Sequence, residues 1–92
     1  MGVELNEVKE YLRIDSSDED DLIEMMISYA EDLCMDVVRI HDKEEFYQNA
    51  VSKIAVFYAV AYLNEHREDA DFKKLTLTLR AMLFGIREGC YF

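Results

Sequence analysis

Residues 5–27 read LNEVKEYLRIDSSDEDDLIEMMI, and this stretch decides the fold because it holds two helices joined by a short acidic corner. Apolar residues recur at three- and four-residue spacing on both sides of the corner, which is the pattern of amphipathic helices. The first helix is expected over residues 7–12, with Asn6 as its N-cap. Two turns of helix are not stable alone in water, so this helix must pack against a larger element.

The acidic corner predicts the start of a second, long helix over residues 18–40. Ser16 and Glu19 have the spacing of a capping box, and the acids of residues 18–21 lie where the positive end of the helix dipole favours negative charge. The apolar stripe of this helix keeps helical spacing throughout and consists of Leu22, Ile23, Met26, Ile27, Ala30, Leu33, Cys34, Val37 and Val38.

A third helix is expected over residues 43–66, with Asp42 and Glu45 in capping positions. Its main apolar stripe consists of Phe46, Ala50, Val51, Ile54, Tyr58, Ala61 and Tyr62. Phe57, Val60 and Leu63 lie outside that stripe, so the helix is apolar nearly all round. Because such a helix is buried on more than one side, it is either central in the domain or in contact with another subunit.

After a polar loop at residues 65–71, a fourth helix is expected over residues 72–88, with Asp71 as its cap. Its stripe consists of Leu75, Leu79, Met82, Leu83 and Ile86, while Leu77 and Phe84 lie off it. The chain therefore predicts an all-α fold, a single domain over residues 1–92 built as a small bundle of about four helices. One of these helices is short, two are long and one is C-terminal.

Apolar side chains outside the stripes, together with the apolar end at residues 90–92, are the candidates for contact with other subunits. Interface cores favour aromatic and aliphatic anchors of this kind. The candidate interface residues are Phe57, Val60, Leu63, Phe84, Tyr91 and Phe92. For Phe46, Tyr58 and Tyr62, packing in the core is the expectation.

The charge of the chain is strongly negative and uneven. The formal net charge is −10, which excludes a generally basic nucleic-acid binder, since phosphate binding needs Lys and Arg. Residues 1–50 hold 15 acids and 4 bases, whereas residues 51–92 hold 5 acids and 6 bases. The acidic half is either a solvated face or a surface that meets the more basic half of a neighbouring copy.

No residue pattern points to catalysis, a cofactor or a metal site. The acidic run at residues 15–21 lacks the glycine of a calcium loop, and its acids are accounted for by caps and the helix dipole. His41 and His66 stand alone, without a nucleophile motif, and the chain has no glycine-rich phosphate loop. We therefore expect no enzyme activity, no cofactor and no metal ligands.

The cysteines and the hydropathy indicate synthesis in a reducing cytosol. Cys34 falls on an apolar stripe and is expected to be a buried thiol. Cys34 and Cys90 are the only two cysteines, which are too few for a disulfide framework. The N-terminus lacks the pattern of a signal peptide, and the longest nearly apolar run, residues 54–63, is too short to span a bilayer.

Three segments of the chain resemble the head–tail connector (DNA-packaging) proteins of long-tailed bacteriophages. Residues 7–15 (EVKEYLRID) followed by residues 18–23 (DEDDLI) are similar to the family's opening. Residues 62–68 (YLNEHRE) are similar to the end of its long central helix. In the last helix, residues 79–83 (LRAML) and 85–88 (GIRE) lie where the family is described by a Gln-Leu-Arg-Gly motif, but only an arginine and an aliphatic neighbour match, with Gly89 one place later.

The resemblance implies a small helical subunit of the virion, from a phage or a prophage, that is made in the bacterial cytoplasm. It would form a ring of about a dozen copies beneath the portal protein, extend the DNA channel and dock a tail-side connector protein. DNA would pass through the ring without sequence-specific binding, and no membrane is involved. The alternative is a small acidic helical module that binds or regulates another protein, including an inhibitor that mimics the charge of DNA.

Overall fold

The computed structural model describes residues 3–84, which fold as a small bundle of five α-helices. In chain order the helices are α1 (Leu5–Leu12), α2 (Asp20–Val38), α3 (Lys43–Phe46), α4 (Ala50–Glu65) and α5 (Phe72–Met82). Residues 3–84 contain no strand. The predicted all-α bundle is confirmed, with the third predicted helix divided into α3 and α4.

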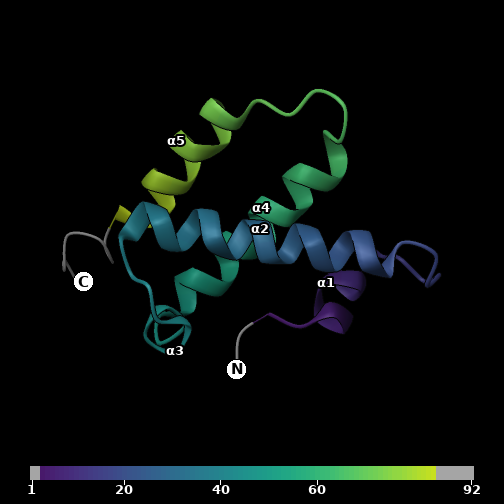
Figure 1. Ribbon diagram of the computed structural model, residues 1–92, viewed down its shortest axis with the longest axis horizontal. Helices are drawn as coiled ribbons and strands as arrows, with labels where there is room; N and C mark the ends of the chain where they lie inside the picture. Colours follow the sequence, from purple (N-terminus) through teal and green to yellow (C-terminus); the bar gives the residue numbers. More distant parts are fainter. Residues whose placement is uncertain (1–2, 85–92) are drawn as a thin grey trace.

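The bundle is built on the crossing of α2 and α4, the pair of helices with the most extensive contact. In Figure 1, α2 runs across the front and α4 passes behind it. The helices α1 and α5 each pack against both α2 and α4, and they lie at opposite corners of the crossing. The helices α1 and α5 therefore present their outer surfaces on different sides of the molecule.

The start of α1 differs from the prediction, because α1 begins at Leu5 and its N-cap is Glu4, not Asn6. The backbone N–H of Glu4 donates to the Glu7 carboxylate at 3.1 Å. At the other end, Arg13 has a φ of 60°, and this left-handed residue ends the helix. Glu4 and Glu7 thus cap the start of α1 in place of Asn6. After Arg13 the chain turns toward α2.

The capping box predicted for Ser16 and Glu19 does not form. The Ser16 hydroxyl accepts a hydrogen bond from the backbone N–H of Asp18 at 3.2 Å, and α2 begins later, at Asp20. The Glu19 carboxylate instead binds Arg67, at the far end of α4. A charge-assisted contact with two hydrogen bonds outcompetes the weaker local cap.

The break between α3 and α4 is the largest departure from the predicted helices. Asp42 caps α3 as predicted, since its carboxylate accepts from the Glu44 backbone N–H at 3.2 Å. Asn49 then has an extended backbone and starts a new helix, a position that asparagine favours. The break leaves Phe46 fully buried and turns the Tyr47 side chain toward α2.

The apolar stripe predicted for the third helix is wrong over α4. Ile54 is 57% exposed and Tyr58 is 38% exposed. The buried positions of α4 are Ser52, Ala55, Val56, Ala59 and Val60. Small side chains at these positions let α2 and α4 approach closely, and this close packing decides which face of the evenly apolar α4 is turned inward.

The last described helix begins as predicted, but it ends at Met82 with Leu83 as its C-cap, whereas the prediction continued the helix through this position. Asp71 caps α5, because its carboxylate accepts from the Lys74 backbone N–H at 3.1 Å. Leu75, Leu79 and Leu83 are buried as the stripe predicts. The predicted C-terminal extension of this helix beyond residue 84, including Ile86, lies outside the described residues.

A single core unites the helices. Its fully or nearly buried apolar residues are Val8, Ile23, Met26, Ile27, Ala30, Cys34, Met35, Val38, Phe46, Ala55, Val56, Ala59, Val60, Leu75, Leu79 and Leu83. Burial of each of the larger aliphatic side chains contributes about 1.5–3 kcal/mol. Cys34 is fully buried, so the predicted buried thiol is confirmed, and this burial raises the pKa of the thiol to about 12.

One acid, Glu31, is buried on the inner face of α2. Its carboxylate accepts a hydrogen bond of 2.7 Å from the Tyr47 hydroxyl and lies 3.1 Å from the Lys43 ammonium group. Burial and this hydrogen bond raise the pKa of Tyr47 well above its usual value. A buried carboxylate needs such partners, so Glu31 holds the α3 segment against α2.

Candidate functional site

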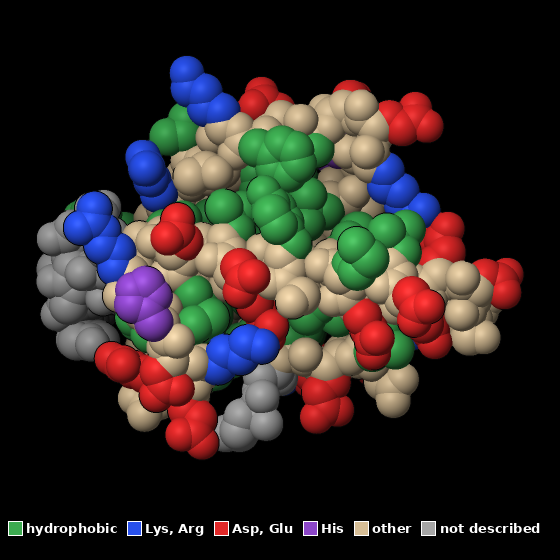
Figure 2. Space-filling view, in the orientation of Figure 1, with side chains coloured by type: hydrophobic (Ala, Val, Ile, Leu, Met, Phe, Trp, Pro, Cys, Tyr) green, Lys and Arg blue, Asp and Glu red, His purple; other side chains and the backbone are tan. Residues whose placement is uncertain are grey.

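Within residues 3–84, the structure presents three exposed apolar surfaces. The first is an open groove of about 620 Å³ beside α2. Figure 2 shows hydrophobic side chains gathered above α2 near the middle of this face. The residues that line the groove are Leu22, Met25, Met26, Tyr29, Leu63, His66, Arg67, Ala70 and Phe72, and we refer to this surface as the groove.

The apolar side of the groove is built by helical spacing. Leu22, Met25 and Tyr29 follow one another at three- and four-residue intervals on α2, so they lie in a row along one side of the helix. Tyr29 meets Phe72 of α5 edge to face, with ring centroids 5.9 Å apart. Met25 is 69% exposed, the largest exposure among the bulky apolar side chains of the described chain.

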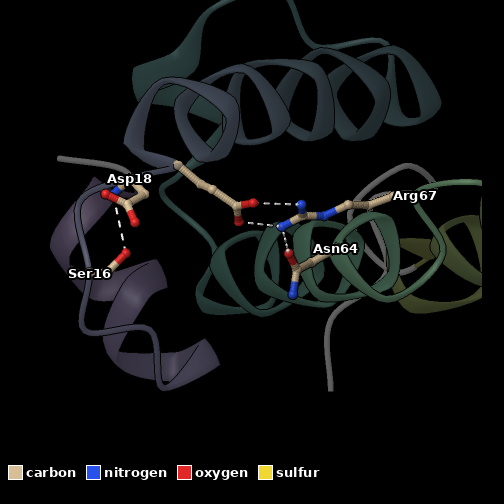
Figure 3. Close-up of polar contacts among 5 residues, drawn as sticks. Ser16, Asp18, Asn64 and Arg67 are labelled. Atoms are coloured by element: carbon tan, nitrogen blue, oxygen red, sulfur yellow. Dashed lines mark hydrogen bonds and ion pairs between the residues drawn. The ribbon is translucent and has the colours of Figure 1, made fainter.

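An ion pair closes one end of the groove. The Arg67 guanidinium donates to the two carboxylate oxygens of Glu19 at 2.7 and 3.0 Å, and to the Asn64 side-chain oxygen at 2.7 Å (Figure 3). The hydrogen bond from Arg67, and next its positive charge, hold the pKa of Glu19 below its usual value. This contact joins the start of α2 to the end of α4.

The second surface lies where α1 meets the outer side of α4. Tyr11 and Phe57 stack with ring centroids 5.2 Å apart and an interplanar angle of 9°. Ile54 continues this surface on the outside of α4, because it lies three residues before Phe57 and four residues before the exposed Tyr58. We refer to Tyr11, Ile54, Phe57 and Tyr58 as the α1–α4 face.

A second ion pair fixes α1 on this face. The Lys53 ammonium group lies 2.7 Å from the Glu7 carboxylate, and its hydrogen bond is the main cause of the lowered pKa of Glu7. The remaining exposed acids of the α1 region, Glu4 and Glu10, have no ion pair within the described residues. The α1–α4 face is therefore apolar, and Glu4 and Glu10 outnumber the one unpaired exposed base of the α1 segment within residues 3–84, Arg13.

The third surface is the outer side of α5, which we call the α5 edge. It consists of Lys73, Leu77, Arg80 and Phe84, which recur at four-, three- and four-residue intervals and are all exposed. Leu77 is 53% exposed and Phe84 is 56% exposed. Lys73 and Arg80 make no ion pair with any residue of 3–84, and α5 carries no acid between Phe72 and Met82. The α5 edge is apolar and basic.

The structure separates the residues that were predicted to form an interface. Phe57 lies on the α1–α4 face, Leu63 lines the groove and Phe84 belongs to the α5 edge. Val60 is fully buried in the core between the helices, so it offers no surface to another subunit and its selection is corrected. Tyr91 and Phe92 lie outside the described residues.

Sequence reasoning missed Tyr11, Met25, Tyr29 and Phe72 as surface residues. Met25 and Tyr29 were the only apolar residues of the α2 segment up to residue 30 that fell outside its stripe, and this signal could have identified them. Tyr11 and Phe72 carried no such signal, because their exposure depends on how α1 and α5 pack.

Other kinds of site find no support in the described part of the chain. Within residues 3–84, no group of three or more His, Cys, Asp or Glu side chains could hold a metal ion. None of the described helices has the length and apolarity needed to cross a membrane. The two histidines lie apart, His41 after α2 and His66 at the end of α4, where it lies 3.4 Å from Asp69.

Comparison with known proteins identifies the family. A search of curated proteins and of solved structures finds no significant match. A family model described as "Phage gp6-like head-tail connector protein" matches residues 3–84, which is nearly the whole chain. This description names a structural component of the phage and no enzymatic activity. The chain belongs to the phage gp6-like head-tail connector protein family.

Proposed function

We propose that this protein is the subunit of a ring at the head–tail junction of a tailed phage or prophage, beneath the portal protein. The ring continues the DNA channel and receives a tail-side connector protein. The observation that carries the proposal is the placement of two unlike, complementary surfaces, the α1–α4 face and the α5 edge, around opposite corners of the α2–α4 crossing (Figure 1).

A ring requires a heterologous contact, in which one patch of each subunit binds a different patch of the next. The α1–α4 face is apolar with exposed acids, Glu4 and Glu10, at its border. The α5 edge is apolar with two exposed bases, Lys73 and Arg80. Apolar contact and opposite charge together support repeated head-to-tail association of identical copies.

The charge of the chain suits a channel through which DNA moves. With a net charge of −10, the protein offers DNA phosphates little of the counterion release that drives tight binding. This charge supports the proposal that the duplex passes without tight or sequence-specific binding. An acidic lining favours sliding, whereas a basic lining would hold the DNA in place.

An inhibitor that mimics DNA would need acids in a continuous, phosphate-like row. On the exposed side of α2, the acids Asp21 and Asp32 are separated by the exposed apolar residues Met25 and Tyr29. This interruption favours a surface that meets another protein through apolar contacts. The structural subunit is therefore the function that the surfaces support best.

The experiment is an exchange of charges between the two surfaces. One variant carries Lys73→Glu and Arg80→Glu, and a second carries Glu4→Lys and Glu10→Lys. Each variant alone would place like charges at every contact, so we expect neither to assemble with the portal protein. An equal mixture would alternate the two variants and restore opposite charges at every contact, so assembly should return.

Particle mass, measured by light scattering or mass photometry in the presence of the portal protein, gives the readout. The matched control is Glu44→Lys with Glu45→Lys, which also reverses two exposed charges but lies on α3, a helix that contributes no residue to either surface. This control should assemble as the wild type does. Assembly of either charge-reversed variant on its own, or no recovery in the mixture, would reject this pairing of surfaces.

A further inference from the structure

The groove is left open by the proposed ring contact, and its surroundings indicate what it binds. Its interior is mainly apolar, with Leu22, Met25 and Tyr29 on one wall and Leu63 and Phe72 on the other. An exposed apolar groove of this size on a small protein marks a binding surface for another chain.

Acidic residues border the groove on two sides. On the α2 side, Asp21 and Glu24 are exposed beside the apolar row that starts at Leu22. On the other side, the loop that contributes His66, Arg67 and Ala70 to the lining also carries three exposed acids, Glu68, Asp69 and Asp71. Figure 2 shows Asp and Glu side chains around the hydrophobic patch, mainly toward the α2 N-terminal end.

The bases near the groove do not cancel this charge. Arg67 lines the groove, but its two terminal guanidinium nitrogens, Nη1 and Nη2, already donate hydrogen bonds to Glu19 and Asn64. Lys73 lies past Phe72, in a neighbouring depression that it shares with Leu77 and Arg80. The groove thus combines an apolar lining with negative borders.

We propose that the groove binds a basic amphipathic segment of a flanking virion protein, with the apolar side chains of that segment on Met25, Tyr29 and Phe72. Its lysines and arginines lie against the acidic borders. The row from Leu22 to Tyr29 spans about 10 Å, which is two turns of helix, so a helical segment fits with apolar anchors at positions i, i+3 or i+4, and i+7. Only the source of the segment rests on the proposed function, since the groove and its charge do not depend on the ring.

The test uses synthetic helical probe peptides and the full-length protein. The first probe carries Leu and Phe at the anchor positions and Lys at all others. The second has the same apolar residues with Glu in place of Lys, and the third has the Lys composition with the anchors scrambled. Binding is measured by fluorescence anisotropy and by the methyl NMR signals of the methionines, among which Met25 and Met26 line the groove.

The first probe should bind at least about tenfold more tightly than the other two, because it alone satisfies both the apolar lining and the charge. Raising the salt concentration from about 0.05 M to about 0.5 M should weaken binding without abolishing it, since the apolar contacts persist. Equal binding of the Lys and Glu probes, or of the ordered and scrambled probes, would overturn the proposal.

Two variants locate the site. Met25→Glu should weaken binding of the first probe by about tenfold or more, whereas Ile54→Glu, a similar change on the opposite side of the α2–α4 crossing, should leave it unchanged. Met25→Glu should still form rings with the portal protein, so loss of the groove and loss of the ring are separate results. If Met25→Glu abolished self-association instead, the occupant would be a second copy of this chain and the proposed partner would be wrong.

Discussion

Arg67 and Glu19 meet through two hydrogen bonds of 2.7 and 3.0 Å, although 48 residues separate them in the chain. Glu19 lies in the acidic opening and Arg67 in the segment that ends the central helix, two of the segments that carried the family resemblance. The contact fixes the loop after α4 against the start of α2. It therefore sets the shape of one end of the groove.

The Arg67–Glu19 pair predicts a dependence of stability on acid pH. The folded pKa of Glu19 lies below its ordinary value of 4.5, because Arg67 hydrogen bonds to and attracts the carboxylate. The contribution is present above the unfolded pKa and is lost as the pH falls through the lower folded value. Glu19→Gln should flatten the acid limb of a urea-unfolding profile measured from pH 7 downward.

Glu24→Gln is the control for this measurement, since Glu24 is exposed on the same helix and makes no ion pair within residues 3–84. It should leave the acid limb as steep as in the wild type. An equal flattening by both substitutions would show that the general negative charge, and not the pair with Arg67, governs the acid limb.

The buried thiol predicts a loss of stability at alkaline pH. The pKa of Cys34 is raised from 9.0 to about 12 by burial, and next by the charge of Glu31. Stability is therefore unaffected by this group below pH about 9 and falls between that pH and about 12, by at most about 1.4 kcal/mol per pH unit. Cys34→Ala should make the alkaline slope of the unfolding free energy shallower. An unchanged slope would contradict the burial of the thiol.

The hydrogen bond between Tyr47 and Glu31 should contribute to stability. Tyr47→Phe removes the hydroxyl and leaves the buried carboxylate with Lys43 alone, so we expect a loss of about 1–2 kcal/mol in the free energy of unfolding. Tyr58→Phe is the control, because the Tyr58 side chain is exposed. Chemical denaturation should show a clear shift of the midpoint for Tyr47→Phe only; equal shifts would argue against the buried hydrogen bond.

The stacking of Tyr11 on Phe57 should hold α1 in place. Tyr11→Ala removes a ring pair that is worth about 0.5–1.5 kcal/mol, so the amide protons of α1 should exchange faster while those of α2 keep their protection. Tyr11→Phe keeps the ring and should behave as the wild type. If α1 kept its protection in Tyr11→Ala, the Lys53–Glu7 pair and the burial of Val8 would be sufficient to dock it.

The sequence predicted the helices that have one dominant apolar face. The α2 stripe and the α5 stripe were found by spacing, and the caps at Asp42 and Asp71 by residue type. These features are local, because they depend on side chains within one or two turns of one another. The family resemblance was found in the same way, from short segments.

The features that failed depend on contacts distant in sequence. Glu31 is buried, although a charged side chain is expected on the surface. Its burial depends on the hydrogen bond from Tyr47 and the ion pair with Lys43, both from the α3 segment. The orientation of α4 could not be predicted, because an evenly apolar helix has no preferred face until α2 selects one. The groove depends on three helices meeting, so no single stretch of the sequence contains it.

The central claim is that this subunit forms a closed ring with the portal protein, and the most direct measurement is the mass of the assembled particle. Wild-type protein mixed with portal protein should give one particle that contains many copies of this chain, and electron microscopy should show it as a ring beneath the portal. Ile54→Glu, which places a charge on the α1–α4 face, should remain folded and lower the yield of this particle. A wild-type protein that remains monomeric beside the portal at every concentration would contradict the account.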